Sequence, residues 1–206
     1  FPAFSPDGRT LYFCSAEAKK IPEEYKEIRY NLCSIDFDPS AGTFGSRIDT
    51  LVNAEALGKS VSFPRPSYDG KYIMFTLSDY GNFSIWHKEA DLWLLDLTSG
   101  DLRKLSEVNS DDTESFHNWS SNSRWFVFSS RRGDGLYTRL YLASMDENGK
   151  ISKPFLLPQE DPETYYDRSV YSYNVPDFTS EPIKIDTRVF EKKITSKERI
   201  QVQAKK

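Results

Sequence analysis

Few side chains in this 206-residue sequence have the types and spacing that catalysis requires. The two histidines, His87 and His117, lie in different parts of the chain, and their separation matches neither the ligand spacing of a zinc site nor a His-based triad. No Gly-x-Ser-x-Gly segment is present, so the nucleophile elbow of an α/β-hydrolase is missing. We therefore predict a non-enzymatic chain that uses no metal and no cofactor.

Two short polar segments could suggest ligand sites, but their spacing does not support this. Gly133-Asp134-Gly135 lacks the third glycine and the strand-to-helix context of a dinucleotide fingerprint, so we interpret it as a loop. Asp111, Asp112 and Glu114 carry oxygen ligands of the kind that calcium takes, yet their spacing matches no calcium loop.

The two cysteines, Cys14 and Cys33, are too few for a disulfide framework. One ends a predicted strand and the other begins the next, so antiparallel pairing could bring them together, and an oxidising compartment would permit a bond. Two buried thiols are the alternative. The sequence leaves both states open.

Binding chemistry is better represented than catalytic chemistry. Aromatic, arginine and carboxylate side chains gather between apolar runs, and aromatic residues mixed with arginines at loop positions are typical of interface anchors. Functional residues also concentrate on loops that a rigid scaffold holds. We expect a protein or peptide partner at one loop-rich face, which collects Arg65, Asp79, Tyr80, Trp86, His87, His117, Arg131, Arg132, Asp134 and Tyr137.

A repeat shows which elements position these loops. Residues 1–13 have a close copy at 63–75 and a looser copy at 117–128, in which Ser5, Ser67 and Ser120 align. Self-similarity of this kind indicates one structural unit built several times.

Each copy contains the chemistry of a tight turn. Asp7-Gly8 and Asp69-Gly70 supply a carboxylate that bonds local backbone, followed by a glycine that takes positive φ. In the third copy Asn122-Ser123 stands in their place. Because asparagine tolerates the left-handed conformation best among non-glycine residues, we expect Asn122 to adopt it.

Short apolar runs after each turn predict strands. The first set lies at 11–14, 73–76 and 126–129, the second at 32–36, 92–96 and 140–144, and the third at 47–51, 102–105 and 151–157. Together with the segment that precedes each turn, these runs give each unit four strands, with one longer connection between the second and third. Tandem four-stranded antiparallel sheets are typical of β-propellers. We predict an all-β propeller fold with three blades over residues 1–178, at about 1–60, 61–115 and 116–178.

The C-terminal residues 179–206 fall outside this repeat. Alternation over 181–190 predicts a further strand that could close a neighbouring blade, whereas 191–206 is charged and predicts a frayed tail. Residues 181–206 carry eight Lys/Arg against four Asp/Glu, so this segment is basic.

The repeat resembles a known family. Ser5-Pro6-Asp7-Gly8-Arg9 followed by Leu11-Tyr12-Phe13 is similar to the WD40-like (PD40) repeat of TolB-type propellers of the bacterial periplasm, over roughly residues 1–157. The resemblance implies a six-bladed ring, of which three blades would be the C-terminal half. It also implies a periplasmic location and leaves an outer-membrane anchor in the full-length protein as an open alternative. Open sheet edges would then be covered by the missing half of the ring or by association of copies.

Bulk properties narrow the function further. The net charge of −4 argues against nucleic acid as the main partner, because phosphate binding needs a basic surface. No stretch approaches the length of a membrane span. Two alternatives to a protein-binding scaffold remain. One is an accessory propeller of a larger enzyme or c-type haem protein; this chain itself has no Cys-x-x-Cys-His segment for haem attachment. The other is a carbohydrate-binding module that uses Trp86, Tyr80 and Tyr137.

Overall fold

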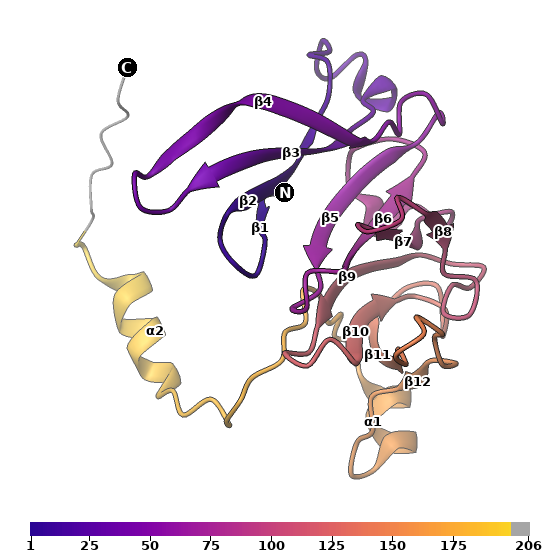
Figure 1. Ribbon diagram of the computed structural model, residues 1–206. Coiled ribbons are helices and arrows are strands. Elements are labelled where there is room, and N and C mark those ends of the chain that lie inside the picture. The colour runs from indigo at the N-terminus through magenta and orange to yellow at the C-terminus, as the bar shows by residue number, and fades with distance from the viewer. Residues whose placement is uncertain (199–206) are drawn as a thin grey trace.

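The computed structural model describes residues 1–198, whose strands form three four-stranded antiparallel sheets (Figure 1). Blade 1 consists of β1 (Ala3–Phe4), β2 (Thr10–Ser15), β3 (Asn31–Asp38) and β4 (Thr43–Val52), with the short helix η1 (Tyr25–Glu27) between β2 and β3. Blade 2 consists of β5 (Ser60–Pro66), β6 (Tyr72–Ser78), β7 (Asp91–Asp96) and β8 (Leu102–Lys104), with η2 (Ser84–Trp86) between β6 and β7. Blade 3 consists of β9 (Glu114–Trp119), β10 (Trp125–Ser130), β11 (Arg139–Ser144) and β12 (Phe155–Leu156). In each blade the strands pair in chain order, so the predicted fold class is confirmed.

The turn between the first two strands is built alike in each blade, with one difference from the prediction. Gly8 has a φ of 70° in blade 1, and Ser123 holds the matching position in blade 3 with a φ of 56°. The expectation that Asn122 takes the left-handed conformation is wrong. Its amide oxygen instead accepts hydrogen bonds from Ser120 Oγ at 2.7 Å and from the backbone N–H of Arg124 at 3.0 Å, which is the role of aspartate in the other turns.

Two buried apolar layers join the blades. In the layer between blades 2 and 3, blade 3 contributes a face rich in aromatic side chains and blade 2 a mainly aliphatic face, whereas the layer between blades 1 and 2 is mainly aliphatic on both sides. In both layers the facing side chains fill the space between the sheets. Between blades 1 and 2 the layer includes Tyr12, Leu32 and Val52 from blade 1 and Ile73, Phe75, Trp93 and Leu95 from blade 2. Between blades 2 and 3 it includes Met74, Leu92, Leu94 and Leu105 from blade 2 and Trp119, Phe126, Phe128 and Tyr141 from blade 3.

The first strands of the blades, β1, β5 and β9, meet at the centre of the array. Their approach is marked by three phenylalanines at the same repeat position. The ring centroids of Phe1 and Phe63 lie 4.2 Å apart, and those of Phe63 and Phe116 lie 4.7 Å apart. Sheets whose first strands converge in this way have the radial arrangement of propeller blades.

The C-terminal region differs from the prediction. Residues 181–190 do not form a strand; the chain instead enters α2 (Thr187–Thr195), where the Asp186 side chain accepts a hydrogen bond from the N–H of Arg188 and caps the helix. A second helix, α1 (Pro162–Arg168), lies within the residues assigned to the third blade and is capped by Asp161. The frayed tail expected for 191–206 is not found up to Thr195, and residues 199–206 lie outside the described part of the chain.

Candidate functional site: the loop face

The three connections between second and third strands, residues 16–30, 79–90 and 131–138, form one surface, which we call the loop face. The first two touch through the N–H of Gly81, which donates to Ile28 O at 2.9 Å, and through Asn82 Nδ2, which donates to Tyr25 O at 3.2 Å. The third connection reaches the second through the guanidinium of Arg131, which lies over the ring of Trp86. The loop face is therefore continuous across all three blades.

Two large aromatic side chains stand out on this face. Trp86 is 66% exposed, and its ring lies 4.7 Å from the guanidinium carbon of Arg131. Phe83 is 80% exposed and has a φ of 50°, a left-handed conformation that is costly for a residue with a β-carbon. The fold thus presents two exposed aromatic rings on the loop face.

A pocket of about 360 Å³ lies beside these rings, lined by Tyr25, Tyr80, Asn82, Phe83, Trp86 and His87. The rings of Tyr80 and His87 are 4.1 Å apart, and Tyr25 meets Tyr80 edge-on at 5.7 Å. His87 is 6% exposed and its Nδ1 lies 3.1 Å from Glu89 Oε1, so it forms part of the base of the pocket. The size is within the usual range for ligand pockets.

Arg132, the neighbour of Arg131, contacts a buried carboxylate instead of an aromatic ring. Its Nη2 lies 2.9 Å from Oε1 of Glu114, a fully buried carboxylate that also accepts hydrogen bonds from Ser110 Oγ at 2.6 Å and Ser130 Oγ at 2.7 Å. Burial raises the pKa of Glu114, and the hydrogen bonds and the arginine charge offset part of that rise. Arg132 therefore holds the third loop in place, and Glu114 is occupied by protein partners.

The two predicted aspartates organise the loops. Asp134 Oδ1 accepts the N–H groups of Leu136 and Tyr137, each at 2.8 Å. Slight burial works against ionisation of Asp134, but these hydrogen bonds and nearby arginine charges outweigh it and lower the pKa of that carboxyl. Asp79 forms an ion pair with Lys59 at the start of blade 2. Both carboxylates stay on the loop face in a supporting role.

Arg65 and His117 do not belong to the loop face, contrary to the prediction. Arg65 lies near the end of β5 and lines a separate depression of about 250 Å³ with Phe4, Tyr68 and others, beside the tight turns. β5 leaves the loop face at Ser60. Arg65 lies five residues further along this strand, which places it about 16 Å from the loop face. Sequence reasoning placed Arg65 at the wrong end because it treated the whole first strand as a connection.

His117 is an interior residue. Its side chain is 2% exposed and its Nε2 lies 2.9 Å from the carbonyl oxygen of Met74. Burial lowers the pKa of His117 to about 4, so the imidazole is neutral at pH 7. It joins blade 3 to blade 2 rather than meeting a ligand.

Sequence reasoning missed the aromatic lining at the centre of the array. A second pocket of about 350 Å³ is lined by several residues, including Phe1, Phe63, Phe83 and Phe116, and borders the first pocket at Phe83. Phe63, Phe83 and Phe116 all have positive φ, at 53°, 50° and 47°. The signal was present in the repeat, because Phe1, Phe63 and Phe116 each stand four residues before the aligned serine.

The cysteines are both free thiols. Cys14 pairs with Leu32 and Cys33 pairs with Phe13 across β2 and β3, so the two side chains lie on opposite faces of the sheet. The disulfide alternative is therefore wrong. Burial raises the pKa of Cys14 to about 12 and also raises that of Cys33, which makes both thiols weak nucleophiles.

Residues 1–198 contain no group of three or more His, Cys, Asp or Glu side chains placed to hold a metal ion. Within the same residues, no helix has the length and apolar character needed to cross a bilayer.

Comparison with known proteins places the fold. No protein-family model matches the chain, and no curated protein matches it in sequence. An ancestral GH74 enzyme superimposes with a TM-score of 0.51 at 9% identity, over 76% of this chain and 18% of that one. The chain has a β-propeller fold.

Other solved propellers are similar at low identity. TolB from Acinetobacter baumannii is 21% identical over 74% of this chain and 31% of its own, with a TM-score of 0.43. A putative TolB from Agrobacterium tumefaciens is 19% identical over 74% of this chain and 46% of its own, with a TM-score of 0.49. This chain spans less than half of each of these proteins.

Proposed function

We propose that this propeller is a non-enzymatic scaffold that binds a protein or peptide partner through the loop face. The observation that carries the proposal is the pair of exposed aromatic rings, Phe83 and Trp86, beside the pocket on that face. Following the resemblance of the repeat to TolB-type propellers, we also propose that it acts in the bacterial periplasm.

The energetics favour a binding role for these rings. Fully burying a large apolar side chain contributes about 1.5–3 kcal/mol, so two rings at one site can supply the core of an interface. Phe83 also keeps a left-handed backbone while exposing its ring, and strain of this kind costs about 1–3 kcal/mol per residue. Strain held at an exposed aromatic residue is typical of binding sites.

The stack of Arg131 on Trp86 supports a protein partner. Tryptophan, tyrosine and arginine are the residues most enriched among interface hot spots, and all three occur here within one connected surface. The guanidinium lies over one side of the ring and helps to fix its orientation, so less rotamer freedom is lost on binding.

The test compares capture from a periplasmic extract by the wild-type chain and by a double variant, Phe83→Ser with Trp86→Ala. A matched control, Trp125→Ala, removes a 41% exposed tryptophan from the outer part of blade 3. We expect a partner that the wild type and the control retain and the double variant loses. Equal retention by all three chains would contradict the proposal, and glycan binding that depends on Trp86 would favour the carbohydrate alternative.

A further inference from the structure

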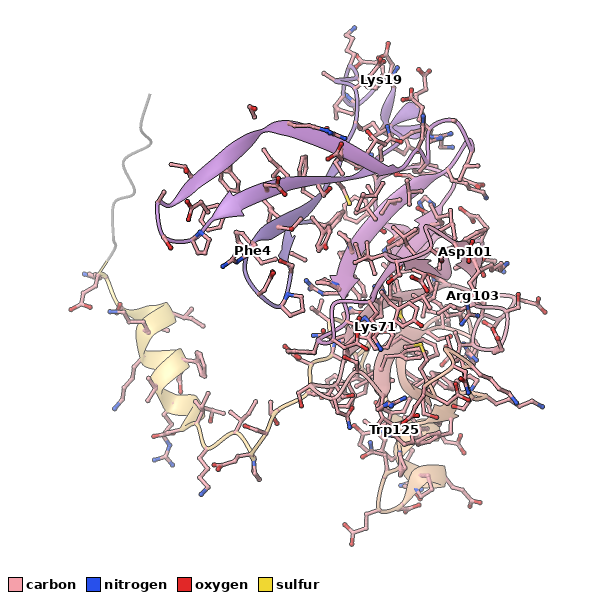
Figure 2. The ribbon with its side chains drawn as sticks, in the orientation of Figure 1. Phe4, Lys19, Lys71, Asp101, Arg103 and Trp125 are labelled. Atoms are coloured by element: carbon pink, nitrogen blue, oxygen red, sulfur yellow. The ribbon has the colours of Figure 1, made fainter. Side chains whose placement is uncertain are left out.

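A depression of about 250 Å³ opens beside the tight turns, at the end of the blades opposite the loop face. All three blades contribute to it, and its lining includes Phe4 and Pro6 from blade 1, Arg65, Pro66 and Tyr68 from blade 2, and Asn118 from blade 3. Figure 2 shows Phe4 and Lys71, which follows the turn of blade 2, away from Lys19 on the loop face. We call this hollow the turn-side depression.

The side chain of Arg65 has no partner within the protein. It is partly buried, and its Nε is fully buried without a hydrogen bond. Within residues 1–198 its guanidinium has neither an ion pair nor a hydrogen bond. Every other partly or fully buried arginine of these residues donates a side-chain hydrogen bond to a protein acceptor: Arg29, Arg103, Arg124, Arg131, Arg132 and Arg139. Because buried polar groups of native proteins are nearly always paired, the exception needs a cause.

Carboxylates near this end of the blades are already engaged. Asp7 and Asp69 each accept hydrogen bonds within their own tight turns. Asp177 accepts a hydrogen bond from Asn118 Nδ2 at 2.8 Å. The chain therefore leaves the positive charge of Arg65 without a counterion, at the edge of a hollow that a separate molecule can enter.

The lining defines the chemistry of a ligand. Arg65 is the only charged side chain that the described residues place there, and the rings of Phe4 and Tyr68 are 48% and 55% exposed. A guanidinium binds a planar carboxylate through two parallel hydrogen bonds. The apolar walls favour an apolar group beside that carboxylate. The volume is below the ~300–1,000 Å³ typical of ligand pockets, so it suits a small group.

We propose that the turn-side depression binds a carboxylate attached to an apolar group, and that Arg65 recognises the carboxylate. Two sources supply this chemistry: the C-terminus of a peptide that ends in an apolar residue, and a glutamate side chain next to an apolar residue. A phosphate carries more charge than one guanidinium can balance, and the excess would lie against apolar walls. The site is separate from the loop face, so it stands or falls independently of the proposed function.

Three short peptides test the chemistry by isothermal titration with the full chain. Acetyl-Gly-Gly-Leu has a free C-terminal carboxylate, its amide has no charge, and acetyl-Gly-Glu-Leu amide has only the glutamate carboxylate. We expect one or both carboxylate peptides to bind at least about tenfold more tightly than the neutral amide, and the stronger of the two identifies the source. Equal binding of all three peptides, or no binding of any, would overturn the proposal. Inorganic phosphate that binds as tightly as the peptides would also overturn it.

Variants then assign the carboxylate contact to Arg65. Arg65→Met keeps an apolar stem of similar length and should weaken the carboxylate peptides at least about tenfold, to the level of the amide. Arg65→Lys keeps the charge but not the fork, so its affinity should be intermediate. The matched control is Arg29→Met, which removes a guanidinium from the loop face and should leave affinity unchanged. Full binding by Arg65→Met would contradict the assignment.

Unfolding of the free protein separates a ligand contact from a structural one. Without peptide, Arg65→Met should unfold in urea at the same or a higher midpoint than the wild type, because the variant removes a partly buried charge that has no partner. A carboxylate peptide should raise the midpoint of the wild type and not that of the variant. A free variant that unfolds at a clearly lower midpoint would make Arg65 a structural residue and contradict the proposal.

Discussion

Arg131 and Arg132 are neighbours in sequence but belong to two different regions of the loop face. Arg132 joins the framework, a buried group in which Glu114 receives hydrogen bonds from Ser110 and Ser130 as well as the ion pair. Arg131 is itself buried, and its guanidinium stacks on Trp86; we call Arg131 and the exposed Phe83 and Trp86 the rim. The comparison shows that the exposed aromatic rings stand on loops that buried polar groups hold in place.

The framework should dominate stability. Glu114→Ala leaves Arg132 without its carboxylate in a largely buried site, and breaking such a pair costs about 3–5 kcal/mol. Urea unfolding of the variant and the wild type measures this loss. Glu114→Gln is the control, because it keeps the shape and can still accept from Ser110 and Ser130; a loss below about 1 kcal/mol for Glu114→Ala would remove the framework from the account.

Lowering the pH should destabilise the folded protein through His117, which lies three residues after Glu114 on β9. The pKa of His117 is lowered from 6.5 to about 4 in the folded protein, so the unfolded chain binds the proton more tightly. This contribution to stability is present above pH 6.5 and is lost as the pH falls towards 4, by on the order of 2–3 kcal/mol. The difference in unfolding free energy between the wild type and His117→Gln, followed across this range, isolates the effect. A difference that does not change with pH would contradict it.

The blade architecture could be predicted from sequence because its signals are local. The turn at Gly8 and the apolar runs at 73–76 and 126–129 each specify a short element, and repetition specifies their assembly. The site was only partly predictable. Arg65 was misplaced because strand length decides which end of a blade a residue reaches, and His117 because its side chain is buried against blade 2. The different contacts of Arg131 and Arg132 depend on Glu114, which is distant in sequence.

The C-terminal region shows the same limit. Ile183 and Ile185 alternate as in a strand, yet no sheet edge receives them, and Asp186 starts a helix just beyond. Residues 169–178, which run against blade 3, likewise have no sequence pattern, because their contacts are mostly made by backbone carbonyl and N–H groups that any residue carries.

The rim should tolerate a change that relieves strain. Phe83→Gly places at φ 50° a residue that accepts positive φ freely, so the unfolding free energy should stay unchanged or rise by up to about 1 kcal/mol. Partner capture should weaken at the same time, because the exposed ring is lost. Thermal unfolding and capture from extract measure the two effects, and a loss of stability above about 1 kcal/mol would place Phe83 in the framework instead.

The smallest effect on stability is expected for Trp86→Ala. The ring is 66% exposed, and losing its stack with Arg131 should cost no more than about 1 kcal/mol.

Measuring partner binding and unfolding free energy on Trp86→Ala and Glu114→Gln side by side tests the separation of rim and framework most directly. We predict that Trp86→Ala stays folded and loses the partner that Glu114→Gln still binds. If Trp86→Ala binds that partner as the wild type does, the loop face is not the binding surface.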